Sequence, residues 1–342
     1  MLNSQKFHAL DGLRGLAAIF VLNRHAEEYW GGVAYHSYLA VDLFFLLSGF
    51  VIAHSYERKL ASGSMSSRNF VVTRIIRLYP LYFMSLLLAF AVSSQLATPE
   101  VVARSLFMVP SFGEGSLFPL DVVYWSLFFE LVVNGIYIIA RPKLTDKVLG
   151  GIVVAFGVAL VYLARREGGN YLGFEGVTIH FVGGFVRAVF GIFLGVLMYR
   201  HRRRLSELLP RFFGPVGALA AACAVLALPS AGRFDWAIDA FAVLVVFPLC
   251  VVGALGALPP RAVPVLSLLG AASYPLYLFH PMLAKVGLMW LPASIPQYTP
   301  LSGLVFAVTV VVISVGLNTV DAWIRARLTE WVAPFRRSSK TS

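Results

Sequence analysis

Charged residues are scarce in this chain. Only 13% of its 342 residues are Asp, Glu, Lys or Arg, whereas soluble domains carry about 25%. Hydrophobic residues make up 58% of the chain. This composition excludes an ordinary soluble enzyme.

Cysteine is also nearly absent. Cys223 and Cys250 are the only two, and both lie in apolar stretches far from any CxxC or Cys/His spacing that binds zinc. The sequence therefore predicts no disulfide framework, no thiol nucleophile and no metal site.

Apolar blocks of about 18 to 24 residues recur from end to end, which is the length that crosses a bilayer core. The predicted spans are 10–30, 38–56, 77–97, 121–140, 148–164, 180–199, 212–229, 236–257, 266–291 and 301–324. We therefore expect an all-α polytopic membrane protein of about ten transmembrane helices. Residues 1–330 would form one membrane-embedded domain, and 331–342 a short basic cytoplasmic tail with no appended soluble domain.

The basic residues predict the orientation of the chain. If the N-terminus is inside, 20 of the 28 Lys and Arg residues fall in inner segments and four in outer ones. The positive-inside rule then places both termini in the cytoplasm and the protein in the cell (inner or plasma) membrane. The net charge of +11 is thus attributed to the basic residues that orient the chain in the membrane. No nucleic-acid partner is expected.

The longest outer connection is predicted over residues 98–120. It is rich in Pro and Gly, and its stretch 106–112 is apolar enough to dip into the membrane. We expect this segment to cap an outward-facing site.

Ionisable residues inside spans need partners, a wet cavity or a function. Arg14 and His25 are eleven residues apart in the first span, which puts them on nearly one helix face about 16 Å apart. A long thin ligand such as coenzyme A could touch both. Alternatively, Arg14 reaches cytoplasmic headgroups and His25 makes an interhelix hydrogen bond.

Asp42 enters the second span from the outer side, to about the depth of His25. A carboxylate at one ring nitrogen would fix the imidazole tautomer and leave the other nitrogen free as a general base. We expect Asp42 to be that partner, with a helix-end cap as the alternative.

Arg74 and Arg77 stand at i and i+3 near the cytoplasmic end of the third span. Two guanidinium groups there suit a pyrophosphate or 3′-phosphate, although basic anchors at span ends also look like this. Glu130, one turn after Trp125, must be protonated, paired with a positive group or in contact with water. Its expected partner is Arg14, Lys285 or a histidine. His280 precedes Pro281, which is expected to open the ninth helix.

Five stretches in order now resemble the membrane acyltransferase-3 family: LDGLRGLAAIFVLNRH, AVDLFFLLSGFVIAHSY, RNFVVTRIIRLYP, YWSLFFE and SYPLYLFH. The family hallmark of a basic residue, ten residues and a histidine is met by Arg14 and His25. Two features depart from the family pattern. Many members have a second acidic residue after Glu130, and many have a hydrolase-like domain after the last span.

The resemblance implies transfer of an acyl group, usually acetyl, from acyl-CoA to a glycan hydroxyl, with His25 essential and Arg14 engaging the donor. Other positions typical of the family are Asp11, Asp42, Ser48, Gly49, Arg74, Arg77, Glu130 and His280. We assign His25, Asp42 and Glu130 to catalysis and Arg14, Arg74, Arg77 and Ser48 to donor binding. Asp11, Trp125 and His280 are assigned to the acceptor.

The expected co-substrate is acetyl-CoA, and the expected partners are the bilayer and a glycan or other hydroxyl acceptor. A sugar hydroxyl is a poor nucleophile, so its attack needs a base, and the oxyanion needs donors such as Arg24, Ser48 or a Tyr. Two other classes stay open at this point. Buried charges and an interrupted helix also suit a transporter or flippase of glycan or lipid intermediates, and a scaffold subunit would need no His25.

Overall fold

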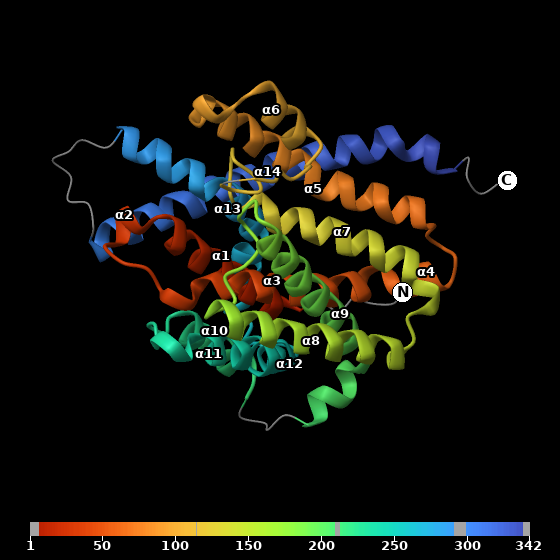
Figure 1. Ribbon diagram of the computed structural model, residues 1–342. Helices are drawn as coiled ribbons and strands as arrows, with labels where there is room; N and C mark the ends of the chain where they lie inside the picture. The colour runs from red at the N-terminus through yellow and green to blue at the C-terminus, as the bar shows by residue number, and fades with distance from the viewer. Residues whose placement is uncertain (1–6, 114, 209–212, 291–298, 338–342) are drawn as a thin grey trace.

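The protein is built from helices. The computed structural model describes residues 7–113, 115–208, 213–290 and 299–337, which form one bundle (Figure 1). Its α-helices are α1 His8–His25, α2 Glu27–Trp30, α3 Ala40–Ile52, α4 Arg58–Ala61, α5 Ser67–Val92, α6 Pro99–Leu106, α7 Tyr124–Ala140, α8 Asp146–Glu167, α9 Thr178–Leu208, α10 Pro215–Leu226, α11 Asp235–Phe241, α12 Phe247–Gly253, α13 Val263–Trp290 and α14 Pro300–Arg337. Short 3₁₀ turns are η1 Tyr35–Leu39, η3 Ser94–Leu96, η4 Arg141–Lys143 and η5 Gly232–Phe234, and π-helical turns are η2 Ala53–Glu57 and η6 Ala242–Val246.

Seven helical segments of the described chain are long and apolar enough to cross a membrane. They are Tyr35–Ala61, Ser67–Val92, Asp146–Glu167, Thr178–Glu207, Gly232–Gly253, Val263–Trp290 and Pro300–Ala333. These segments match seven of the ten predicted spans and confirm a multi-pass membrane protein. The other three predicted spans coincide with α1, α7 and α10, which are not among these seven segments. Helix α1 carries three charged residues, and α7 and α10 are short, with only 17 and 12 residues. The count of ten stays a prediction.

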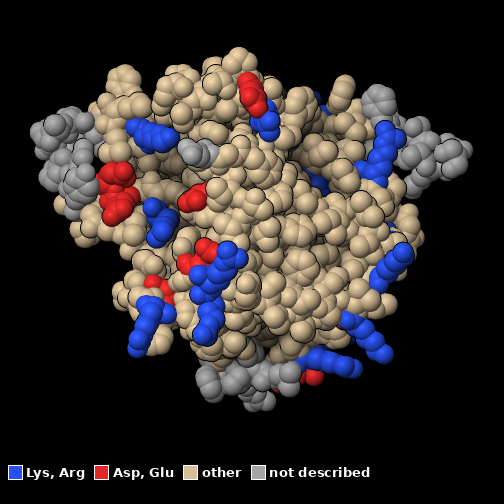
Figure 2. All heavy atoms as spheres, viewed as in Figure 1, with Lys and Arg blue, Asp and Glu red and all other residues tan. Residues whose placement is uncertain are grey.

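The outer surface suits a lipid environment. In Figure 2 most of the visible face is uncharged, and Lys and Arg gather at its two sides. Apolar side chains such as Val154, Val158 and Val312 are each about two-thirds exposed. Since soluble monomers rarely expose such broad apolar surfaces, this band is interpreted as the lipid-facing belt.

Helix α1 begins, and α14 ends, on the same side of the bundle (Figure 1). We call this side the N-terminal end and the other side the opposite end. The two ends of α1 therefore carry Arg14 and His25 toward different sides of the molecule, as their spacing predicts. Which side faces the cytoplasm stays a prediction.

Close contact between α1 and α13 depends on glycine. A Cβ atom added at Gly15 would lie 2.5 Å from Leu269 Cβ, and one at Gly270 would overlap Asp11. Small residues let membrane helices approach backbone to backbone. The polar side chains of α1 are thereby held directly against α13.

The family-typical Gly49 has a similar role between α3 and α9. A Cβ atom there would overlap the backbone oxygen of Ile192, and one at Gly195 would overlap the backbone of α3. Both glycines are needed for this close crossing, which places the polar groups of α3 beside those of α9.

A buried polar network joins η1, α3, α9, α11 and the segment after α8 at the opposite end. Asp42 accepts hydrogen bonds from Arg187 Nη2 at 2.7 Å and from Asn170 Nδ2 at 3.2 Å. Asp239 accepts from the backbone N–H of Asn170 at 2.7 Å and lies 2.9 Å from His36 Nδ1. Since these groups satisfy one another, their burial in a membrane protein is tolerable.

Three boundaries differ from the sequence prediction. Helix α5 begins at Ser67, ten residues before the predicted span, because Ser66 Oγ accepts from the backbone N–H of Asn69 at 3.2 Å and caps the helix. Helix α14 continues to Arg337, so the predicted tail 331–342 is helical as far as that residue, and 338–342 lie outside the described residues. Helix α13 is continuous through Pro281, so the predicted opening of the ninth helix is wrong.

The predicted outer connection 98–120 contains α6 and then a folded segment that lies over the opposite end. Its backbone pairs with the connection before α9, where the N–H of Leu117 donates to Phe174 O at 2.8 Å and the N–H of Gly113 donates to Gly176 O at 3.1 Å. Phe107 at its start is 80% exposed. These pairings fix the segment 116–122 beside the end of α1.

Candidate functional site

A first cavity of about 330 Å³ opens between α1, α3, α5, α7, α13 and α14, beside the N-terminal half of α1. It brings together six residues singled out in the sequence, namely Asp11, Arg14, Ser48, Arg74, Arg77 and Glu130. It also contains polar residues that the sequence analysis missed: Ser126, Tyr274, Tyr277, Asn318, Asp321 and Arg325. The predicted donor-binding set is therefore gathered at one place.

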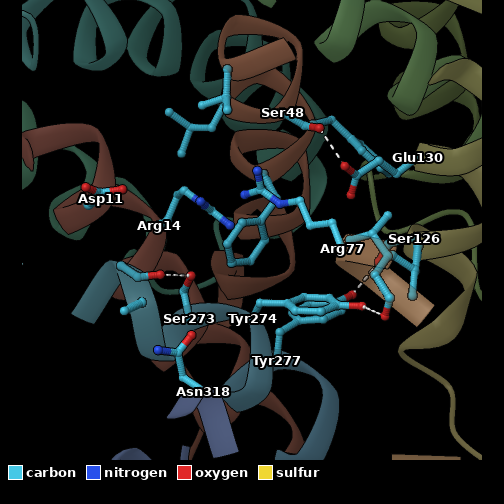
Figure 3. A pocket seen from close by; sticks show the side chains of 18 of the residues that line it. Asp11, Arg14, Ser48, Arg77, Ser126, Glu130, Ser273, Tyr274, Tyr277 and Asn318 are labelled. Atoms are coloured by element: carbon cyan, nitrogen blue, oxygen red, sulfur yellow. Dashed lines mark hydrogen bonds between the residues drawn. The ribbon is translucent and has the colours of Figure 1, made fainter. Parts of the chain in front are cut away.

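Two arginines of this cavity are available to a ligand. Arg14 and Arg77 reach into it from α1 and α5 (Figure 3). Neither makes a hydrogen bond or an ion pair with any residue in the described ranges. Since guanidinium groups bind phosphate through paired N–H donors, these two side chains form a candidate anion site.

Arg74 is already paired. Its Nη2 donates to Glu130 Oε1, which also accepts from Ser48 Oγ at 2.6 Å (Figure 3). Arg74 is only 4% exposed, and removing one partner of a buried pair is costly. Arg74, Glu130 and Ser48 thus form the wall of the cavity, which answers the question of what contacts Glu130.

Helix α14 supplies the missed side chains Asn318, Asp321 and Arg325. Arg325 Nε lies 2.8 Å from Asp321 Oδ2. Their spacing of i, i+3 and i+7 places them on one helix face, and this periodicity was the signal that could have found them. From the sequence, Arg325 is only one of the basic residues that set the topology.

A second cavity of about 260 Å³ lies at the opposite end, around the C-terminal end of α1. His25, Glu28, Asp121 and Lys285 line it, together with the segment 116–122. Among the described residues, the two cavities share no lining residue. Both nevertheless lie along the same pair of helices, α1 and α13.

His25 and His280 meet between the cavities. His280 Nε2 lies 3.1 Å from His25 Nδ1, while the Nδ1 atoms lie 3.1 Å from backbone carbonyls, Val21 O for His25 and Leu276 O for His280. A carbonyl oxygen can only accept, so each neutral ring carries its proton on Nδ1. The one proton of His25 Nδ1 is then shared between two acceptors, Val21 O and His280 Nε2. His25 Nε2 keeps its lone pair and has no hydrogen-bond partner among the described residues.

The expected pairing of His25 with Asp42 is wrong. Asp42 is bound to Arg187 by two hydrogen bonds, at 3.0 and 2.7 Å, and both side chains are 2% exposed. Helix α9 supplies a different partner to Asp42, the guanidinium group of Arg187. His280, assigned above to the acceptor, occupies the place that was predicted for Asp42.

Other predicted residues are placed elsewhere. Trp125 lines neither cavity of the described structure, and its ring packs under Arg187, whose Cζ lies 5.1 Å from the ring centroid. Asp11, assigned to the acceptor, lies in the first cavity beside Arg14. Arg24 donates to the backbone oxygen of Tyr35 at 3.2 Å, so it is not a free oxyanion donor.

Tyr277 stands where the first cavity ends and the histidines begin. Its hydroxyl lies 2.6 Å from Ser126 Oγ, and its ring centroid lies 6.1 Å from that of His280. His280 itself is fully buried. A ligand that extends from the first cavity to His25 must therefore displace or pass these side chains.

Fold and site together define a class, a multi-pass membrane protein with a basic cavity and a histidine-containing cavity along one helix pair. The family model for an acyltransferase domain matches residues 7–319. The chain therefore belongs to the acyltransferase 3 family, a family of acyl-CoA-dependent O-acyltransferases. It is an acyltransferase of the membrane.

Two curated relatives extend this result. The chain is 39% identical over 188 residues to "Protein 2 in picA locus" of Rhizobium radiobacter, which covers 48% of this chain and 96% of the relative. It is 26% identical over 294 residues to "Exopolysaccharide production protein ExoZ" of Rhizobium meliloti (strain 1021), covering 77% and 83%. No solved structure gives a significant match.

Proposed function

We propose that this acyltransferase moves an acetyl group from cytoplasmic acetyl-CoA to a hydroxyl of an exported or cell-surface glycan, with His25 as the general base. The observation that carries the proposal is that His25 lines the second cavity while its Nδ1 contacts Val21 O and His280 Nε2, which leaves Nε2 as its free nitrogen among the described residues. The similarity to an exopolysaccharide production protein supports a glycan acceptor.

The donor end of the proposal rests on the first cavity. Arg14 and Arg77 would hold the phosphates of coenzyme A, because they are the guanidinium groups of this cavity without a partner among the described residues. The thioester would then extend along α1 toward His25, which lies about 16 Å further along the helix axis. This route passes Tyr277, so donor binding is expected to move that side chain.

The transfer step follows from the position of His25 Nε2. The acceptor hydroxyl gives its proton to this nitrogen while its oxygen attacks the thioester carbonyl carbon. The carbon–sulfur bond then breaks, the acyl group stays on the sugar oxygen, and the coenzyme A thiolate takes up the proton. The two substrates would come from opposite sides of the membrane, with the positive-inside rule placing the first cavity at the cytoplasmic side.

The test is transfer of radiolabelled acetyl groups from acetyl-CoA by the purified protein in vesicles, with isolated cell-surface glycan as the acceptor. We expect label in the glycan with the parent protein and none with His25→Gln, which removes the base but keeps a polar side chain. Donor binding should survive in His25→Gln, because the phosphate contacts lie about 16 Å away.

Controls separate this proposal from the other classes. His8→Gln is a matched variant, because His8 is at the start of α1 and does not line either cavity. It should keep the parent rate. If His25→Gln also transferred label at the parent rate, His25 would not be the base. If the parent protein moved unmodified glycan across vesicles without transferring label, the transporter interpretation would be favoured.

A further inference from the structure

The second cavity has a defined wall on each side. Helix α13 contributes Pro281, Met282 and Lys285, and the segment 116–122 contributes Phe118 and Asp121. The segment is tied down by its backbone pairing with the connection before α9. The cavity is therefore a preformed site, with a volume slightly below the range of about 300 to 1,000 Å³ that is usual for small-molecule sites.

Asp121 is a buried polar group that the protein leaves partly unsatisfied. It is 2% exposed, and its Oδ1 accepts from the backbone N–H of Val123 at 3.2 Å. Its Oδ2 has no hydrogen-bond partner among the described residues. Buried polar atoms without a partner are rare and costly, so each points to a missing partner. A carboxyl oxygen beside this cavity suits a ligand hydroxyl.

The charged residues that line the cavity give an anion no net attraction. Glu28 and Asp121 are its acidic lining residues and Lys285 is its basic one. Lys285 Nζ already lies 3.4 Å from Ser93 Oγ. Burial raises the pKa of the Asp121 carboxyl to about 7, so the charges of Glu28 and Lys285 nearly cancel and a carboxylate or phosphate on the ligand would find no net positive charge.

The remaining wall is apolar, with Phe118, Pro119, Met282 and Leu288 among the lining residues. A pyranose ring has both features that this cavity complements, hydroxyl groups at its edge and C–H groups on its faces. A charged or purely apolar ligand would leave one part of the wall unmatched.

We infer that the second cavity binds the acceptor as a neutral pyranose unit, with Asp121 hydrogen-bonded to its hydroxyls and another hydroxyl presented to His25. This inference rests on the proposed function, since His25 would be the base for the bound sugar. It adds the acceptor class and names Asp121 and Glu28 as residues that determine specificity.

The experiment compares methyl β-D-glucopyranoside with its 6-carboxylate, methyl β-D-glucopyranosiduronate, as acceptors of radiolabelled acetyl. The two probes differ only at C6, where a carboxylate replaces the primary hydroxyl, and they share all their other hydroxyls. We expect kcat/KM to favour the neutral probe by about tenfold. Glu28→Lys should reverse most of this preference, because Glu28 is exposed at the cavity and its charge changes sign. Glu27→Lys is the matched control, since Glu27 is equally exposed on α2 but does not line the cavity.

Asp121→Leu provides a second arm. The substitution keeps the approximate volume and removes both oxygens, so KM for the neutral probe should rise about tenfold, as expected for one hydrogen bond to a carboxyl. Asp121→Asn keeps an acceptor and a donor and should restore most of the binding. The donor KM should stay at the parent value in both variants.

The outcomes separate the two proposals. If the neutral and anionic probes are used equally, or if Glu28→Lys and Glu27→Lys behave alike, the neutral-pyranose assignment is wrong while acyl transfer stands. Release of coenzyme A without transfer to either probe would also overturn the pyranose assignment. If even the isolated cell-surface glycan receives no label, the proposed function itself fails.

Discussion

His280 Nε2 accepts the proton of His25 Nδ1 across 3.1 Å, so one buried histidine orients the other. Leu276 O and Val21 O fix the Nδ1–H tautomers of His280 and His25, and the His280 ring then holds the His25 ring in place. An uncharged orienting partner suits this depth of the membrane, because a carboxylate there would need its own counter-charge. The proposed base is thereby positioned without a second buried charge.

Changing His280 tests this relationship. His280→Leu removes one of the two acceptors of His25 Nδ1–H and leaves only Val21 O on the same helix, so the ring loses its contact with α13 and can turn. We expect kcat to fall by about 10²-fold, within the range for general base catalysis, with the donor KM unchanged. His280→Gln keeps an oxygen acceptor and should retain a larger part of kcat. Parent-like turnover by His280→Leu would show that His280 only packs against His25.

Arg77→Ala tests the donor site. Arg77 lines the first cavity and is not needed by Glu130, which Arg74 already pairs with. The donor KM should rise about tenfold for acetyl-CoA, as for the loss of one charge-assisted hydrogen bond. The KM for an acetyl-pantetheine donor, which lacks the nucleotide phosphates, should not change. Arg68→Ala, in the first turn of the same helix and outside the cavity, is the control, and an equal loss with both donors would exclude phosphate contact.

Asp42→Asn should act on stability. Asp42 and Arg187 are buried together at 2.7 Å, and breaking a buried ion pair costs about 3 to 5 kcal/mol. We expect a clear fall in the unfolding temperature in detergent, with folded protein keeping its kcat. Asp146→Asn is the matched control, because its pair with Arg200 is half exposed and worth about 0 to 1 kcal/mol. A stable Asp42→Asn protein with reduced kcat would instead restore Asp42 to the catalytic site.

The sequence predicted that several charged residues gather at one place, for a physical reason. Arg14, Arg74, Arg77 and Glu130 are charged residues in apolar segments, where any charge needs a partner or a cavity. We could therefore expect these residues to lie together, and in the structure they line one cavity. The spacing of Arg14 and His25 likewise follows from helix geometry alone.

The partners of these residues could not be predicted. Depth along the membrane normal was available from the sequence, but the rotation and neighbours of each helix were not. Asp42 and His25 have similar predicted depths, yet Asp42 contacts Arg187 of α9 and His25 contacts His280 of α13. Asp121 was missed because it looked like the first residue of a span, whereas the structure places it in a folded segment before α7.

Reporter fusions test the orientation. Positions 70, 145 and 205 should report cytoplasm, because the ends of the helices near them carry most of the basic residues. Positions 110 and 232 should report the outside. Reversed signals at 70 and 205 would place the first cavity outside and remove cytoplasmic coenzyme A as its ligand. A discordant signal at 110 alone would mean that the segment after α6 re-enters the membrane.

The burial of the Asp121 carboxyl leads us to expect a specific dependence of stability on pH. Burial raises the pKa of this carboxyl to about 7, above its value of about 3.9 in an unfolded chain. Between these values the unfolded state loses its proton while the folded state keeps it, so the free energy of unfolding falls as the pH rises from about 4 to about 7. Asp121→Asn resembles the protonated carboxyl and has no proton to lose. Its unfolding temperature should match the parent at pH 4 and exceed it at pH 8, measured by thermal unfolding in detergent. An equal difference at both pH values would mean that folding does not shift the pKa of Asp121. A variant less stable than the parent at pH 8 would mean that Asp121 is ionised and paired in the folded protein, with Lys285, whose charge lowers this pKa, as the candidate partner.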